Sequence, residues 1–123
     1  MSTTFKQGED KKITITVISK GTDVDVSTCT NIKAIIRMDN EPQKKYSLLE
    51  ESDHGILLVD EDTVNKVHIF IEREHSKNFP IGQMNLVLLC SFPNSDFADG
   101  TEVREFAFNS GRVIKGNGAD EFI

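Results

Sequence analysis

The chain has 123 residues, of which 37% are hydrophobic and 28% charged, a composition typical of a soluble globular domain. Its length allows one domain that buries roughly two thirds of the surface its unfolded chain would expose, so folding needs neither a disulfide nor a metal. The 14 Lys and Arg against 20 Asp and Glu give a formal charge of −6, a sign that disfavours direct contact with nucleic-acid phosphates.

The N-terminal segment and the apolar runs predict no membrane contact. The opening MSTTFKQGED lacks the apolar core of a signal peptide. The longest uncharged apolar run, 86–90, is far too short to span a bilayer. We therefore expect a soluble protein that is made in the cytosol.

Short alternating runs fill most of the chain. Residues 1–11 are polar and aperiodic, so we expect an N-terminal arm there, with the fold starting at Lys12. Beyond it, apolar residues recur at every second position, the pattern of half-buried strands, and turn residues separate the runs. Strands are expected at 12–19, 31–38, 43–50 (an edge), 56–59, 67–72, 83–92 and 101–109, with 112–115 as either an eighth strand or the start of a tail.

The stretch 67–92 organises the rest of the chain. Residues 74–78 break the alternation with a polar run that predicts one helical turn, which Phe79-Pro80 ends. We expect Phe79 to be buried beneath this turn and Gly82 to adopt a backbone conformation that a side chain would restrict. From 86 to 90 the next strand is apolar on both sides, which predicts the central strand of a sheet.

This stretch carries a resemblance to a known family. An apolar strand, a helical turn, Phe-Pro-x-Gly and a long apolar strand resemble the "strand, L-x-x-E-x-x-x-L-P-x-G, strand" element of the immunoglobulin-like N-terminal domain of phage baseplate upper proteins. Phe79 stands where that family has Leu, and Gly82 matches its Gly. Upstream, the segment 25–29 resembles the family's D-L-T-G-A turn, with Thr28 for Gly and Cys29 for Ala. The resemblance spans most of the chain and implies an immunoglobulin-like fold in a phage particle.

The predicted elements define the fold class. Seven to eight short strands with one short helical turn and no long amphipathic segment predict an all-β, antiparallel β-sandwich. The resemblance makes this sandwich immunoglobulin-like. We expect it to occupy residues 12–115, between the arm at 1–11 and a flexible C-terminal tail at 116–123.

Two cysteines, Cys29 and Cys90, have a sequence separation that an immunoglobulin disulfide could also show. The chain has no Trp to pack on such a bridge, and Leu88 stands where an antibody domain has its corner Tyr. Because the cytosol keeps thiols reduced, we predict two free, buried cysteines that pack separately.

The polar residues predict no catalytic or metal centre. His54, His68 and His75 lie on a loop, an outward strand face and the helical turn, without the spacing of metal ligands. Asp53 and the acidic run 60–62 lack the alternation of a calcium loop, so a solvated strand end explains them better. No nucleophile motif or phosphate-binding glycine loop is present. We therefore expect a protein that is not an enzyme and has no cofactor.

Apolar residues outside the predicted core suggest interaction surfaces. Either they form a second core layer or they form an assembly interface. Phe97, in the polar loop 93–100, either folds back on the core or awaits a partner, and Phe122 and Ile123 end the tail, where we expect them to dock on an adjacent subunit. These three are the candidate interface residues, and the predicted outward apolar positions are Ile18, Ile35, Leu57, Val59, Phe70, Val87 and Leu89.

Two functions fit these features. The resemblance implies a phage virion structural protein, a non-catalytic adaptor in a tail, baseplate or capsid, made in the host cytoplasm. Its partners would be other virion structural proteins in a multi-copy symmetric assembly, with no nucleic acid or membrane in direct contact. The alternative is a cellular immunoglobulin-like module that binds protein or carbohydrate, although one Tyr and no Trp leave little to stack on a sugar.

Overall fold

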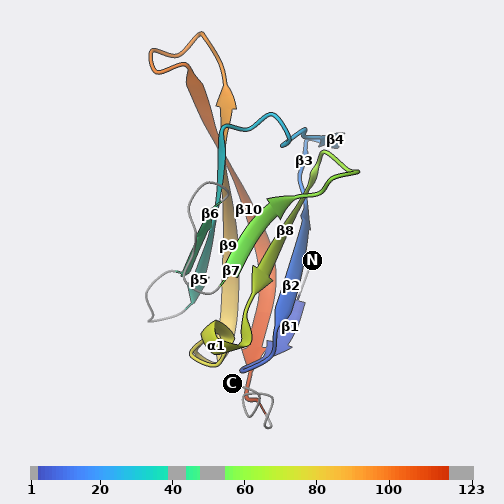
Figure 1. Cartoon of the computed structure of the whole chain (residues 1–123), viewed down its shortest axis with the longest axis vertical. Coiled ribbons are helices and arrows are strands. Elements are labelled where there is room, and N and C mark those ends of the chain that lie inside the picture. Colours follow the sequence, from blue (N-terminus) through green and yellow to red (C-terminus); the bar gives the residue numbers. More distant parts are fainter. Residues whose placement is uncertain (1–2, 39–43, 48–54, 117–123) are drawn as a thin grey trace.

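The structure, a computed structural model, describes residues 3–38, 44–47 and 55–116. This part of the chain forms two facing β-sheets, a small hairpin and one short helix (Figure 1). The elements are β1 (Thr3–Lys6), β2 (Lys11–Thr16), β3 (Ile18–Ser19), β4 (Thr22–Asp23), β5 (Asn31–Met38), β6 (Lys44–Ser47), β7 (Gly55–Val59), β8 (Lys66–Ile71), α1 (Arg73–Ser76), β9 (Gly82–Pro93) and β10 (Thr101–Ile114).

The two sheets differ in size. The large sheet has the strand order β1-β10-β9-β5-β6, and the small sheet has the order β2-β8-β7. All pairs are antiparallel except β1 with β10, which is parallel. The predicted antiparallel β-sandwich with one helical turn is therefore confirmed, and the predicted edge strand is β6, at one end of the large sheet.

Strand β9 lies at the centre of the large sheet, as its two apolar sides predict. It pairs with β5 on one side and with β10 on the other. Leu88, for example, lies between Ala34 of β5 and Phe106 of β10. One face of β9 packs against the core, and the other face points away from it.

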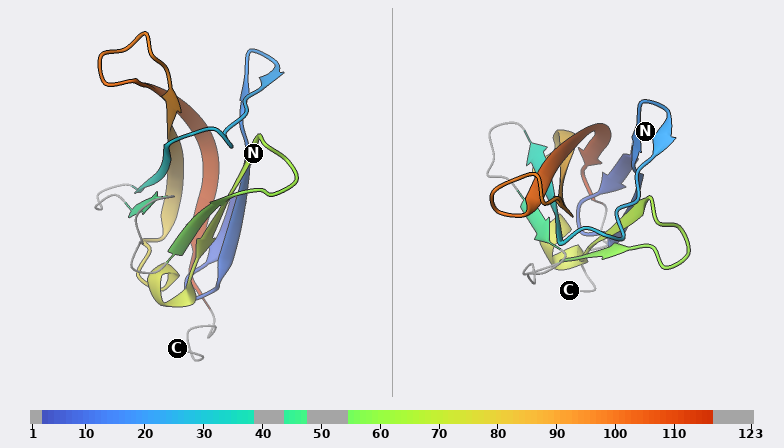
Figure 2. Two further views of the ribbon diagram at one scale, coloured as in Figure 1. Left: turned by 45° about the horizontal axis from the view of Figure 1, so that its top comes forward. Right: turned by 90° about the horizontal axis from the view of Figure 1, so that it is seen from above.

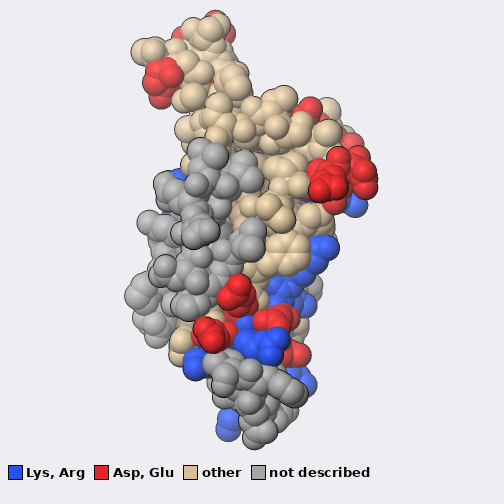
Figure 3. Space-filling model, viewed as in Figure 1, with Lys and Arg blue, Asp and Glu red and all other residues tan. Residues whose placement is uncertain are grey.

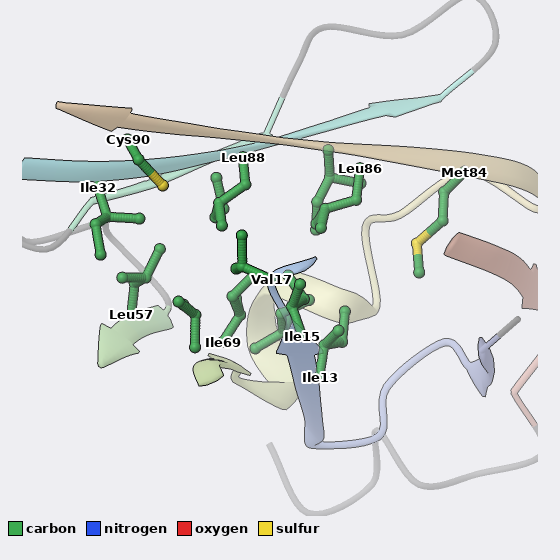
Figure 4. Close-up of a cluster of buried hydrophobic side chains, with 14 of the residues drawn as sticks. Ile13, Ile15, Val17, Ile32, Leu57, Ile69, Met84, Leu86, Leu88 and Cys90 are labelled. Carbon is green, nitrogen blue, oxygen red and sulfur yellow. The ribbon is translucent and has the colours of Figure 1, made fainter. Parts of the chain in front are cut away.

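The hydrophobic core fills the space between the two sheets. Alternate residues of β5 and β9 point toward alternate residues of β2, β7 and β8 (Figure 4). Burying these branched and aromatic side chains supplies most of the free energy that opposes the conformational entropy of the unfolded chain. The buried set includes Ile13, Ile15, Val17, Ile32, Ala34, Ile36, Leu57, Val67, Ile69, Ile71, Phe79, Met84, Leu86, Leu88 and Cys90.

The segment that follows α1 carries the residues that the sequence singles out. Phe79 is fully buried, and its ring packs edge-on against His75 with 5.1 Å between ring centroids. Gly82 has φ of 140°, a region that residues with a side chain rarely adopt. Both predictions for this motif are confirmed.

The N-terminal prediction is wrong for the described residues. Thr3–Lys6 form β1 rather than an arm, and the next four residues are held by hydrogen bonds to α1 and to Phe79. Gln7 Nε2 donates to the Phe79 carbonyl oxygen (2.7 Å), and the Gly8 amide donates to Ser76 Oγ (3.0 Å). Periodicity could not reveal this anchoring, because it depends on polar contacts between segments far apart in sequence.

The first predicted strand is also shorter than expected. It divides into β2 and β3, and Lys20-Gly21 turn the chain back into β4 with φ of 53° and 77°. Positive φ at both central residues is the signature of a two-residue hairpin turn whose twist matches its strands. The described part of the chain thus has ten strands instead of seven to eight, the additional ones being β1, β3 and β4.

At the C-terminal side, β10 is one long strand instead of two. Its register with β9 shifts between Asn109 and Gly111. Gly111 has φ of 140°, so the bulge uses backbone freedom that glycine provides. The segment expected at 112–115 therefore continues β10 to Ile114.

Candidate interaction surfaces

One side of the large sheet faces away from the core and is rich in apolar side chains. We call it the outer face. On it, Ile35, Val87 and Leu89 are half-buried, as predicted for outward apolar residues, and Val103 is 65% exposed. The outer face comprises Asn31, Lys33 and Ile35 of β5, Val87, Leu89 and Ser91 of β9, and Val103, Glu105 and Ala107 of β10.

A shallow groove crosses the outer face. Its volume is about 180 Å³, and it runs between β5 and β10 over Leu89 and Ser91 of β9. The lining residues are Asn31, Lys33, Leu89, Ser91 and Val103. The lining mixes the apolar side chains of Leu89 and Val103 with polar ones, as protein contact surfaces do.

The other predicted outward positions divide into two groups. Ile18 is 52% exposed and Phe70 is 36% exposed, in agreement with the prediction. Leu57 is buried in the core and Val59 packs against it, so the prediction is wrong for both. Their strand is a run of four apolar residues, which contains no alternation to distinguish its two faces.

The hairpin of β9 and β10 projects beyond the sandwich (Figure 2). Phe97 lies in its loop, between the end of β9 and the start of β10. The loop is held by its own hydrogen bonds: the Asn94 amide donates to the Gly100 carbonyl (2.8 Å), and the Gly100 amide donates to the Phe97 carbonyl (2.9 Å). Phe97 is 49% exposed on this ordered loop, so it does not fold back into the core. Acidic side chains surround the hairpin tip (Figure 3).

A cleft lies between this hairpin and the hairpin of β3 and β4. Its volume is about 360 Å³, and its lining includes Asp23, Asp25, Phe92 and Arg104. The Arg104 guanidinium lies 5.7 Å from the Phe92 ring centroid and 5.2 Å from that of Phe106. Because acidic and basic groups share this small space, it favours neither a purely anionic nor a purely cationic ligand.

On the small sheet, three polar residues form a chain of hydrogen bonds. His68 Nε2 lies 2.8 Å from Asp60 Oδ1, and its Nδ1 lies 3.0 Å from the Thr14 hydroxyl. The hydrogen bond with His68 holds the pKa of Asp60 below its usual range. Asp60 Oδ2 also accepts from the Thr63 amide (2.8 Å), which explains the acidic run 60–62 as a strand end bonded to its own turn.

This set has the order of a hydroxyl, an imidazole and a carboxylate, as in hydrolases. Neither the groove of the outer face nor the cleft between the hairpins includes any of the three residues. The hydrogen bonds instead connect β2, β8 and the turn before β8, which is a structural role. The alternation along the strand predicted an outward His68, but no sequence pattern pointed to Asp60 and Thr14 as its partners.

The two cysteines are free, and their thiols lie near enough to affect each other's pKa. Burial raises the pKa of Cys90 to about 12 and raises that of the half-buried Cys29. The prediction of separate packing is therefore wrong, because Cys29 lies in the loop that precedes β5 while Cys90 lies on the neighbouring strand β9. Thiols with raised pKa values are weak nucleophiles at neutral pH.

Some predictions cannot be located in the structure. Phe122 and Ile123, the acidic residue Asp53 and His54 lie outside the described residues. Among residues 3–38, 44–47 and 55–116, no group of three or more His, Cys, Asp or Glu side chains could hold a metal ion. Within the same part of the chain, no helix is long and apolar enough to cross a membrane.

Among known proteins, the chain is similar in fold to a solved immunoglobulin-like structure. No protein-family model and no curated protein matches it. Among solved structures it is similar to a marsupial T cell receptor, with a TM-score of 0.50 and 17% sequence identity over 94% of this chain. The match covers 50% of the receptor chain, so this chain spans about half of that protein's length. The chain is thus an all-β, immunoglobulin-like sandwich, and an identity this low shows the fold alone.

Proposed function

We propose that the protein is a non-catalytic structural adaptor of a phage virion, in the tail, baseplate or capsid, where it joins other virion proteins in a multi-copy assembly. The observation that carries the adaptor role is the projecting β9–β10 hairpin. It holds Phe97, 49% exposed, on a loop that its own backbone hydrogen bonds keep ordered. A preformed loop loses little conformational entropy when its aromatic tip enters a partner's pocket.

The phage context rests on the resemblance of residues 67–92 to phage baseplate upper proteins. The placement of Phe79 and Gly82 supports it, because the helical turn, the buried residue before Pro80 and the glycine all have the roles expected for that element. The immunoglobulin-like fold also fits the alternative, a cellular binding module, since one similar solved structure is a T cell receptor. The two functions therefore have to be separated by experiment.

The test uses phage particles purified from cells that carry this gene. We expect mass spectrometry to find the wild-type protein in the particles and Phe97→Ala to lower its amount several-fold. Ile81→Ala is the matched control, because Ile81 is 60% exposed but precedes β9, at the end opposite the hairpin tip. Particles that lack the wild-type protein would exclude the virion role and favour the cellular module. Equal incorporation of Phe97→Ala and Ile81→Ala would exclude the hairpin as the contact.

A further inference from the structure

The charged and apolar residues of the outer face are arranged in a regular pattern across the strands. Its residues form rows across three strands, because β5, β9 and β10 are in register. The middle row has Lys33 on β5, Leu89 on β9 and Glu105 on β10. A neighbouring row is wholly apolar, with Ile35, Val87 and Ala107. Lys33 and Glu105, of opposite charge, thus lie in the same row on either side of the apolar central strand.

We propose that the outer face binds the same face of a second copy of this chain, around a twofold axis that follows β9. Such a rotation places β5 of one copy opposite β10 of the other, and it leaves each row at the same position along the strands. Lys33 then lies opposite the partner's Glu105, and this contact occurs twice. Leu89 and Val87 meet their own copies near the axis, so the apolar centre is covered by an identical apolar centre.

The charge pattern selects this arrangement among the ways of stacking two copies. A twofold axis across the strands would set Lys33 against the partner's Lys33 and Glu105 against the partner's Glu105, and like charges in direct opposition repel. An axis along β9 avoids both repulsions. It also keeps the strands of the two sheets nearly aligned, within the roughly 30° at which twisted sheets pack face to face.

Within one chain, Lys33 and Glu105 are too far apart to form a direct ion pair. Lys33 and Glu105 are two strands apart, about 10 Å between backbones, with Leu89 between them. A bond from Lys33 within its own chain leaves further N–H groups for the partner's carboxylate, since an ammonium has three. A contact of three strands is small by the standard of stable complexes, so we expect a dimer in rapid exchange with its monomer.

This inference deepens the proposed function and rests on it for its biological setting, since a multi-copy adaptor needs contacts between its copies. Its test is made on the purified protein in solution. Absence of a dimer would leave the particle experiment with Phe97→Ala unaffected, and failure of that experiment would leave a solution dimer unaffected.

The experiment is sedimentation equilibrium of the full chain from roughly 1 μM to 1 mM. The average mass of the wild type should rise from 13.8 kDa toward twice that value. Glu105→Lys and Lys33→Glu should each weaken association at least about tenfold, because each turns two attractive contacts into repulsive ones. An equimolar mixture of the two variants should associate about as well as the wild type, since both contacts in the mixed dimer are attractive again. The double variant should also recover.

Two exposed residues away from the outer face provide matched controls. Glu61→Lys and Lys20→Glu make the same changes of charge in turns, and association should not change. Circular dichroism confirms that every variant is folded. A wild type that stays monomeric over the whole range would overturn the proposal. Single variants that associate like the wild type, or a mixture as weak as its components, would overturn it as well.

Discussion

Replacing Phe79 with alanine tests whether the turn between β8 and β9 secures the sandwich. The Phe79 side chain is fully buried, and its ring contacts the ring of His75. Its carbonyl oxygen accepts a hydrogen bond from Gln7, so the same residue also holds the segment between β1 and β2. Truncation would leave a cavity under α1 that the surrounding backbone cannot fill, since hydrogen bonds from Gly8 and Ser76 fix its position.

The expected loss can be given a size. Removal of a buried Phe side chain costs about 3–5 kcal/mol of unfolding free energy, a large part of the roughly 5–15 kcal/mol of a typical domain. For a chain of this length we expect the melting temperature to fall by about 10–20 °C. Differential scanning calorimetry measures the shift, and urea unfolding gives the free energy directly.

The matched control is Phe97→Ala, which removes the same side chain from an exposed loop tip. Its effect on the unfolding free energy should stay within about 0.5 kcal/mol. If Phe79→Ala and Phe97→Ala melted at the same temperature, the buried Phe79 beside α1 would not secure the fold. The assignment of this motif would then be wrong.

Three further predictions concern backbone, charge and thiols. Gly82→Ala should lower the unfolding free energy by about 1–3 kcal/mol through strain at φ of 140°, and an unchanged urea midpoint would contradict this. Hydrogen bonds from Arg73, first from its side chain and then from its amide, lower the pKa of Asp10. Wild type should therefore be more stable than Asp10→Asn above the ordinary aspartate pKa of about 3.9, and this difference should disappear as the pH falls through the lowered pKa of Asp10. Melting temperatures of the two proteins that stay apart at every pH would refute this prediction. Titration of freshly purified, denatured protein should find both Cys29 and Cys90 as thiols, whereas a mass two hydrogens lower with no free thiol would reveal a disulfide.

The sequence predicts the fold best where side chains alternate. The run 86–90 is apolar on both sides, and it becomes the centre of the large sheet with Leu88 inward and Leu89 outward. The same alternation separates Phe106, which packs on the core, from the exposed Val103. A period of two carries this information because successive side chains on a strand point to opposite faces.

Alternation fails where it is absent or where contacts are distant in sequence. The run before Asp60 has four apolar residues, so nothing in it distinguishes the buried Leu57 from the 48% exposed Leu58. The short polar strand β1 owes its position to parallel pairing with β10, more than 100 residues away, as in Phe5 with Val113. Pairing of that kind depends on backbone hydrogen bonds, which side-chain periodicity does not encode.

The same limit explains which features of the surfaces were foreseen. Outward positions on β5 and β9 follow from alternation, and Ile35, Val87 and Leu89 were predicted correctly. The pairing of Lys33 with Glu105 across a row requires the register of three strands, which no local pattern contains. The exposure of Phe97 could not be predicted, because its polar loop has no alternation that would show which way the side chain points.

The two sheets of the sandwich each have an outer side, and their chemistry differs. On the small sheet, the polar groups find partners within the chain: His68 bonds to Asp60 and Thr14, and the Lys12 ammonium lies 5.5 Å from the ring centroid of Phe70. These contacts shield apolar surface with charged and polar groups and suit a surface that faces water.

The outer face of the large sheet has a different construction, because its central strand carries only aliphatic side chains at the rows of Val87 and Leu89. Aliphatic side chains offer water no hydrogen bonds, and removing them from water is favourable in proportion to the apolar area that is covered. Phe97 lies beyond the last of these rows, on the part of the hairpin that projects from the sandwich (Figure 1). A second copy on the outer face would therefore leave the hairpin tip open, and one subunit could contact its own copy and another protein at the same time.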